Sequence, residues 1–421
     1  MAKSTKKTVS PLLAVFITVF IDMLGIGIII PITPNLFLNP AQSILPPDFS
    51  EHSRNILYGF FAATYPFFQF FGAPILGTLA DRFGRKKILQ ISLVGTFIGY
   101  VLFAGAINSK LLWLLFLARA LPGFTGGNIS IALAALADVS KPDEKAKNFG
   151  IVGMAFGLGF ILGPTLGGIL SSPSIVSWFS PATPLYFTAI ITVINMIYVY
   201  KQFPETFTPV ATKGLSIFTG INNLKKAIRM ENMRVILLVI FFQAFGWSFF
   251  MQFNQVYLIH KFHFTNAEIG ILFGYIGIWI AITQGGITRQ IAKYFIPSQV
   301  LRVALFGLAI AILAVLLPDK PWLLYLCNPF IAIFQGLAQP NQTSIVSSLA
   351  SKDSQGEMLG IQQSMQSFAF TIPPIMAGFM LNFDVRLPMV VAAFMTLMAW
   401  GVFFFFFKTE AAPEVSATLA E

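Results

Sequence analysis

The chain is short of charge. Only 10% of its 421 residues are Asp, Glu, Lys or Arg, whereas soluble domains carry about 25%. Hydrophobic residues make up 56% of the chain, and they recur in runs of about 18 residues or more, long enough to cross a bilayer. The composition therefore predicts an integral membrane protein with many spans. The first run is too long for a signal peptide and lacks a small-residue cleavage site, so we expect it to be retained.

Cysteine and histidine are also scarce, which limits the possible chemistry. The single cysteine, Cys327, excludes an intrachain disulfide and is expected to serve packing. The sequence has no metal-spaced His/Cys cluster, paired-carboxylate site, nucleophile elbow or phosphate-binding Gly-Lys loop. We therefore expect no enzyme, no cofactor and no metal site. Without Walker motifs, an ion gradient is the expected energy source.

Twelve apolar stretches separated by short polar breaks run along the chain. They are expected to be helices, because lipid offers no partner to an unpaired backbone group and the stretches are too long for barrel strands. The predicted spans are 9–33, 55–79, 88–107, 111–137, 148–171, 184–200, 234–259, 267–288, 299–317, 321–349, 357–381 and 387–407.

The basic residues are distributed unevenly between the two sides of the predicted membrane. Of the 27 Lys and Arg, 21 fall on the side of the N-terminal tail, five fall on the opposite side, and Arg119 lies inside a span. The positive-inside rule then predicts that both termini are cytoplasmic in a multi-pass protein of the cell inner membrane. The net charge of +10 is a topology signal, so no nucleic-acid partner is expected. The bilayer is the expected surrounding, and we expect a monomer.

A weak internal repeat divides the chain into halves. At an offset of about 210 residues, Gly163-Pro164-Thr165-Leu166-Gly167-Gly168 aligns with Pro373-Pro374-Ile375-Met376-Ala377-Gly378. The predicted fold class is an all-α membrane protein with twelve transmembrane helices in two pseudo-symmetric six-helix bundles, a recognised transporter plan. The predicted domains are an N-terminal bundle 1–200, a cytoplasmic linker 201–233, a C-terminal bundle 234–408 and a cytoplasmic tail 409–421.

The linker contains a candidate surface helix. Apolar residues alternate with basic ones in a spacing that suits an amphipathic helix on the inner leaflet. The residues are Ile217, Phe218, Ile221, Leu224 and Ile228, interleaved with Lys225, Lys226 and Arg229. A plain solvated linker is the alternative.

Two charges lie inside apolar stretches. Asp22 stands roughly 16–20 Å into the first span, and Arg119 lies roughly 12 Å into the fourth from the opposite side. A carboxylate at that depth is costly and marks pairing, proton transfer or binding. Burial favours the neutral acid and a nearby guanidinium favours the carboxylate, which brings protonation within reach of physiological pH. We predict that Asp22 and Arg119 couple transport to protons; a permanent structural ion pair is the alternative.

Neutral amides and aromatic residues occur within several spans, mainly in the C-terminal half. Polar groups at membrane depth tend to face the bundle interior, and such a lining suits a small amphipathic organic substrate. Hydrogen bonding between helices is the alternative role for each amide. The predicted substrate-binding residues are Tyr65, Gln69, Gln243, Trp247, Gln252, Asn254, Gln255, Gln335, Gln339 and Gln363. His260 and His263 are expected to be solvated loop residues.

Several motifs resemble the major facilitator superfamily over essentially the whole chain. The loop Gly77-Thr78-Leu79-Ala80-Asp81-Arg82-Phe83-Gly84-Arg85-Lys86-Lys87 is similar to its cytoplasmic signature. Arg119 with Gly123 resembles its second motif, and the glycines of span 5 resemble a motif of antiporters. The run Asp22-Met23-Leu24-Gly25-Ile26-Gly27 is most similar to twelve-helix drug:proton antiporters of the tetracycline-efflux type. The counterpart loop, Gly285-Gly286-Ile287-Thr288-Arg289, departs from the signature because it lacks the acidic residue.

The resemblance implies two conformational devices. A latch of the outward-facing state is implied for Gly77, Asp81, Arg82, Gly84, Arg85 and Asp138, with Asp138 pairing to Arg82 or Arg85. Topology-fixing surface charges are the alternative for this cluster. A helix that limits leak between the halves is implied for Gly153, Gly157, Gly163, Pro164 and Gly167. Ordinary tight packing is the alternative for that helix.

The function implied is proton-coupled antiport that exports amphipathic organic compounds, drugs or metabolites, by alternating access. Such a protein acts in multidrug efflux and antibiotic resistance. A transporter of a siderophore or another metabolite, working as exporter or uptake system, is the alternative of the same fold. A membrane receptor without transport activity is a more distant alternative, against which the intact motifs and the buried Asp22 argue.

Overall fold

The computed structural model describes residues 11–39, 43–126, 128–139, 145–206, 231–349 and 355–407. Within them the regular secondary structure is helical, without strands. The N-terminal half contains α1 (Pro11–Ile29), α2 (Thr33–Leu38), α3 (Glu51–Phe83), α4 (Arg85–Ser109), α5 (Leu112–Thr125), α6 (Asn128–Val139), α7 (Lys145–Leu170) and α8 (Thr183–Gln202). The C-terminal half contains α10 (Glu231–Phe262), α11 (Asn266–Ile282), α12 (Thr288–Ile291), α13 (Pro297–Ala314), α14 (Leu324–Leu349), α15 (Gln355–Met380) and α16 (Leu387–Phe406).

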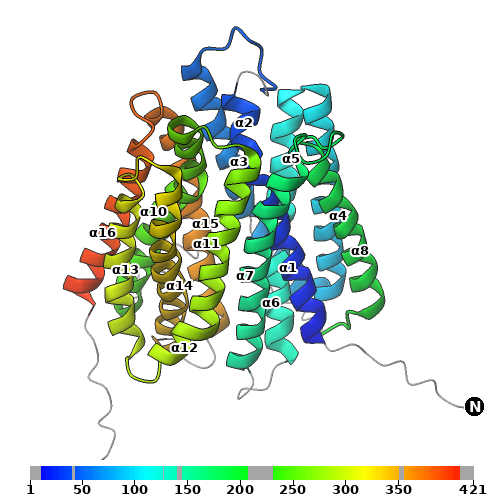
Figure 1. The fold of residues 1–421 in the computed structure, drawn as a ribbon. Coiled ribbons are helices and arrows are strands. Elements are labelled where there is room, and N and C mark those ends of the chain that lie inside the picture. Colours follow the sequence, from blue (N-terminus) through cyan, green and yellow to red (C-terminus); the bar gives the residue numbers. More distant parts are fainter. Residues whose placement is uncertain are drawn as a thin grey trace, which may run out of the picture.

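These helices confirm the predicted all-α membrane architecture. Among the described residues, eight helical segments are long and apolar enough to cross a membrane, and two shorter apolar helices accompany them. Figure 1 shows α4 and α8 on one side of the bundle and α13 and α16 on the other. We call the end where α1 begins and α16 ends the terminal end, and the end that carries α2 the distal end. The predicted surface helix between residues 217 and 229 lies outside the described residues.

Three of the predicted spans depart from a regular α-helix. The first is interrupted by a turn over residues 30–32, which contains Pro31, a residue with no backbone N–H. The fourth stops at Thr125 and restarts at Asn128, just after Pro122 and Gly123. The eighth passes through a π-helical turn, Thr283–Ile287, which includes two glycines. The break in the fourth span matters most, because it places Asn128 at the first position of α6.

Helix α7 forms the seam between the two halves. On one side, Gly159, Gly163 and Gly167 lie so close to α1 that an added Cβ would meet its backbone. On the other side, Gly168 approaches Gly270 of α11 in the same manner. Small residues permit this separation between helix backbones, since they carry no side chain to hold the helices apart. The predicted role of this helix as an interface element therefore has a geometric basis.

The internal repeat appears again as two matching contacts at the distal end. Gly168 meets Gly270 across α7 and α11, and Gly378 meets Gly59 across α15 and α3. Gly168 and Gly378 are 210 positions apart, and Gly59 and Gly270 are 211 apart, so the two contacts are copies of one arrangement.

Side-chain amides reinforce this distal closure. Asn35 Nδ2 donates to Asn266 Oδ1 between α2 and α11. Asn55 Nδ2 donates to Asn382 Oδ1 at 3.0 Å, next to the Gly59–Gly378 contact. Amide hydrogen bonds are worth about 1 kcal/mol each and carry no net charge, so such a closure can form and break at low cost. The two halves are therefore in contact at the distal end through glycine pairs and uncharged amide hydrogen bonds.

Enlarging either glycine is expected to open the distal end. In a Cys327→Ser background with Thr165→Cys as reporter, Gly168→Leu and Gly378→Leu are each expected to raise labelling by an impermeant maleimide several-fold. The reason is that a side chain at either position collides with the opposite helix. Gly401→Leu is the control, because no described atom lies within 4 Å of the position its Cβ would take. Unchanged labelling in both Gly168→Leu and Gly378→Leu would contradict a closed distal end.

Candidate functional site

Asp22 is held within the N-terminal half on α1. It is 7% exposed, so its carboxylate is removed from bulk water. Oxygen Oδ1 accepts a hydrogen bond of 2.9 Å from Asn128 Nδ2, at the start of α6. Oxygen Oδ2 is buried and has no hydrogen-bond partner among the described residues. Only one of the two carboxylate oxygens therefore has a hydrogen-bond donor. A carboxylate in this condition is costly to bury inside a membrane span.

Arg119 lies on α5 and faces the same space. Its guanidinium carbon is 4.8 Å from the centre of the Tyr65 ring and 5.8 Å from that of Phe61. Both contacts are cation–π interactions, which strengthen when the cation is desolvated. Within the described part of the chain, the guanidinium has no ion pair, and its buried Nε has no hydrogen-bond partner. Asp22 and Arg119, which were predicted to meet, therefore line the same cavity without direct contact.

Five helices each contribute a polar side chain to one cavity, and the rest of its lining is apolar. Its volume is about 30 Å³, which is enough to hold water between the polar groups. Its lining includes Asp22, Tyr65, Thr96, Tyr100, Arg119 and Asn128. Asp22 can here exchange a proton with water, and either charged group can receive a polar group of a ligand.

The partner of Asp22, Asn128, was missed from the sequence. Its own carbonyl oxygen Oδ1 accepts from the Ser92 hydroxyl on α4, and Thr96 lies beside its amide nitrogen at 3.4 Å. A signal did exist: the run Gly126-Gly127-Asn128 follows Pro122 within a single apolar stretch. Glycines after a proline favour a helix break, and the residue that follows a break is free to cap or to contact a neighbouring helix.

The predicted substrate-binding residues lie in more than one place. Tyr65 lines the Asp22 cavity, and Gln69 is bonded beside it to the Gly126 carbonyl at 3.3 Å. Gln243 donates to Gln335 at 2.8 Å, linking α10 to α14. Gln255 donates to the Tyr58 hydroxyl at 3.1 Å across the two halves. For Gln243, Gln335 and Gln255, interhelical hydrogen bonding accounts for the position.

The other predicted binding residues differ in environment. The backbone carbonyl of Gln252 accepts from the Tyr58 hydroxyl at 2.9 Å. Trp247 is half-buried and stacks on Phe250 with ring centres 5.2 Å apart. Asn254 is fully buried, and its side-chain polar atoms have no partner in the described ranges. The side chains of Gln339 and Gln363 are exposed, so both are accessible to a substrate.

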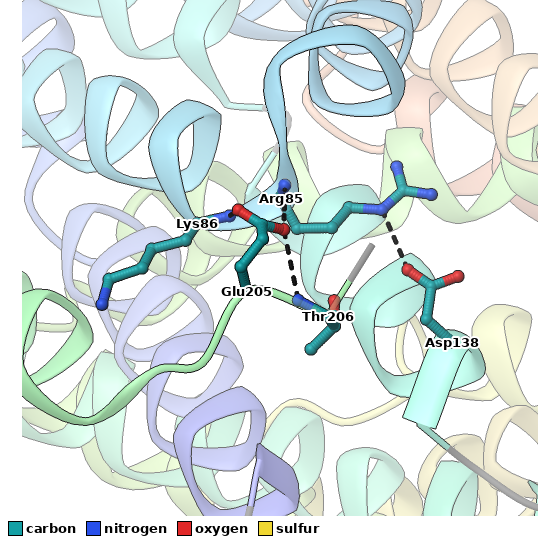
Figure 2. Close-up of polar contacts among 5 residues, drawn as sticks. All are labelled: Arg85, Lys86, Asp138, Glu205 and Thr206. Carbon is teal, nitrogen blue, oxygen red and sulfur yellow. Dashed lines mark hydrogen bonds and ion pairs between the residues drawn. The ribbon is translucent and has the colours of Figure 1, made fainter. Parts of the chain in front are cut away.

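Two of the residues predicted for the latch, Arg85 and Asp138, form an ion pair at the terminal end (Figure 2). Arg85 Nε lies 3.2 Å from Asp138 Oδ2, so Asp138 pairs with Arg85 of the two predicted partners. Gly84 separates α3 from α4 with a φ of 96°, a conformation that favours glycine. No described atom lies within 4 Å of a Cβ placed at Gly77 or Gly157. The side chains of Asp81 and Arg82, and the surroundings of Gly153, lie outside the described residues.

A second acid, Glu205, was not predicted. It follows the end of α8, and its Oε1 and Oε2 accept from the backbone N–H groups of Arg85 and Lys86 at 2.8 and 3.2 Å (Figure 2). A carboxylate at a helix N-terminus satisfies unpaired donors and complements the helix dipole. The sequence signal was an acidic residue, in Pro204-Glu205-Thr206, directly after a predicted span. Glu205 therefore ties α8 to the start of α4.

Comparison with known proteins agrees with this geometry. A family model described as Major Facilitator Superfamily matches residues 15–317 and 236–421. The class B tetracycline resistance protein of Escherichia coli is 26% identical over 372 residues, 86% of this chain and 86% of that protein. The quinolone resistance protein NorA of Staphylococcus aureus (strain MRSA252) is 26% identical over 382 residues, 90% of this chain and 91% of that protein. The human organic anion transporter MFSD10 (TETRAN) has a crystal structure with a TM-score of 0.72 at 20% identity, covering 93% of this chain and 98% of that chain.

Removing the Glu205 carboxylate is expected to destabilise the terminal end. Glu205→Ala leaves two N–H groups at the start of α4 without their acceptor, at a cost of about 1 kcal/mol. The expected result is a lower Tm in thermal unfolding of the purified protein. Asp319→Ala is the control, since Asp319 is 93% exposed and its pair with Lys261 contributes little. Equal Tm values for the two variants would argue against the capping role.

Proposed function

This chain belongs to the major facilitator superfamily, and we propose that it exports amphipathic organic compounds in exchange for protons. The observation that carries the proposal is the half-satisfied Asp22 carboxylate, buried at a cavity beside a guanidinium that has no ion pair among the described residues. A fully satisfied ion pair would hold its charge, whereas a carboxylate with one free oxygen can accept a proton. Similarity to tetracycline and quinolone resistance proteins supports a drug-like substrate.

The closed distal end supports alternating access. The positive-inside bias assigns the distal end to the outside and both termini to the cytoplasm of a bacterial inner membrane. In this assignment, the two glycine contacts and the asparagine pairs close the outer side. In the proposed cycle, the outward-facing state requires those contacts to separate.

The proton cycle follows from the two free groups of the cavity. In the outward-facing state, Asp22 Oδ2 takes a proton from outside, which removes the negative charge before the outer side closes. In the inward-facing state, the proton leaves and Arg119 compensates the carboxylate across the cavity. Asp22 is the acidic residue of this cavity among the described residues, which supports exchange of one proton per cycle.

Neutralising Asp22 is expected to abolish coupling. In proteoliposomes with an imposed pH gradient, wild type is expected to accumulate tetracycline, and Asp22→Asn to lose about tenfold or more of that accumulation. The reason is that the amide cannot carry a proton between the two sides. Asp384→Asn, in an exposed distal loop, is the control. If Asp22→Asn accumulates tetracycline as wild type does and moves the same number of protons, coupling through this residue is wrong.

The unpaired guanidinium favours a second candidate, transport of an organic anion. Arg119 has no carboxylate partner among the described residues, and a buried cation in that condition suits an acidic ligand group. The fold shared with an organic anion transporter supports this class. An acidic metabolite such as a siderophore, the alternative from the sequence, belongs to it.

Replacing Arg119 separates the two substrate classes. Arg119→Gln is expected to reduce uptake of a fluorescent dicarboxylate into proteoliposomes at least tenfold if anions are the substrate, because the ligand loses its charge-assisted hydrogen bonds. Arg119→Lys keeps the charge and is expected to retain part of the activity. Equal dicarboxylate uptake by wild type, Arg119→Gln and empty liposomes would exclude the anion.

A further inference from the structure

We infer that Asn128 is a positioning residue for Asp22, which fixes the carboxylate so that only Oδ2 takes the proton. The inference rests on the proposed proton coupling and names the group that regulates it. It is carried by the orientation of the Asn128 amide and by the place of Asn128 at a helix break.

The amide of Asn128 has partners on both sides. Its Nδ2 donates to Asp22 Oδ1 at 2.9 Å and lies 3.4 Å from Thr96 Oγ1, and its Oδ1 faces the Ser92 hydroxyl. Because the single Ser92 proton is shared between Asn128 Oδ1 and the Thr125 carbonyl, the Asp22 carboxylate is the partner that turns the Nδ2 side toward α1. A fixed N–H donor stabilises a carboxylate oxygen and offers no acceptor to a proton placed on it. Asn128 therefore reserves Oδ1 as an acceptor.

The other oxygen has the opposite character. Oδ2 is buried without a partner in the described part of the chain, and Asp22 lines the cavity. The titratable groups that line it with Asp22 are Tyr65 from α3, Tyr100 from α4 and Arg119 from α5. None of them is within ion-pair distance of Asp22, so Asn128 is the group whose direct contact biases the carboxylate toward its charged form.

The helix break couples the contact between Asn128 and Asp22 to movement of α5 relative to α6. Asn128 is the first residue of α6, and the chain between α5 and α6 is free of regular helix at Gly126. Arg119 lies on α5 and Asn128 on α6, so a change at the break moves the two partners of Asp22 relative to each other. Protonation of Asp22 weakens its hydrogen bond to Asn128 and thereby releases the start of α6.

Infrared titration of the purified full-length protein tests this without any substrate. The protonated carboxylic acid has a C=O stretching band, and the part of it that disappears in Asp22→Asn belongs to Asp22. In Asn128→Leu, the midpoint of this band is expected to differ from the wild-type midpoint by about one unit or more, since the carboxylate loses a charge-assisted hydrogen bond. Asn195→Leu is the matched control: Asn195 is also a buried asparagine, and it contacts Thr18, one turn from Asp22 on α1. It is expected to leave the midpoint unchanged.

The outcomes separate the two hypotheses. A titrating Asp22 band whose midpoint is the same in wild type and Asn128→Leu overturns the role of Asn128 and leaves proton coupling intact. The absence of any titrating band that is lost in Asp22→Asn overturns both. Equal shifts in Asn128→Leu and Asn195→Leu would mark a general loosening of the half and also overturn the inference. Should Asn128→Leu fail to fold, Asn128→Ala and Ser92→Ala are measured in its place. The same shift of the titration midpoint is expected, because Asn128→Ala removes the amide donor and Ser92→Ala removes the hydroxyl beside the amide oxygen.

Discussion

A carboxylate kept inside an apolar bundle is the constraint on which the N-terminal half depends. Bulk water is largely excluded from Asp22, so the chain must supply most of the groups that stabilise its carboxylate. Five helices contribute to its cavity, and two of them, α5 and α6, exist as separate helices only because the fourth span is broken beside it. The break, the cavity and the acid form one arrangement, since the break brings an amide to one oxygen of the carboxylate and leaves the other oxygen free.

The two halves are alike in packing and unlike in chemistry. At the distal end the repeat is visible as two glycine contacts whose members are 210 and 211 residues apart. The charges do not repeat: at the same offset, Pro329 stands where Arg119 would be. A closure that depends on shape can be shared by both halves, because close packing needs only small residues. An energy input that depends on a buried charge needs a single site, since a second one would add its own desolvation cost.

The sequence predicts the fold well and the site only in part. Long apolar runs were sufficient to predict the helical spans, and the position of Asp22 inside an apolar run was sufficient to predict that it is buried. Asn128 and Glu205 were missed, because the local signals beside them, a Pro-Gly break and an acid after a span, do not say which distant group each residue contacts. Their roles come from pairing across 106 and 120 residues, which only the packing of helices defines. The amides show the same limit: their types suggested one binding cavity, whereas Gln243, Gln335 and Gln255 bond between helices.

The separation of Asp22 from Arg119 is itself a requirement of the proposed cycle. A buried carboxylate in direct contact with a guanidinium keeps its charge, because removing that charge strands the cation in a medium of low dielectric. Such a pair stabilises one protonation state and carries nothing. Stacking on Tyr65 and Phe61 gives Arg119 a different partner while Asp22 is neutral, at a strength that a carboxylate can overcome. The rings thus hold the cation within reach of the acid without fixing the charge of the acid, which is the condition under which a proton can enter and leave.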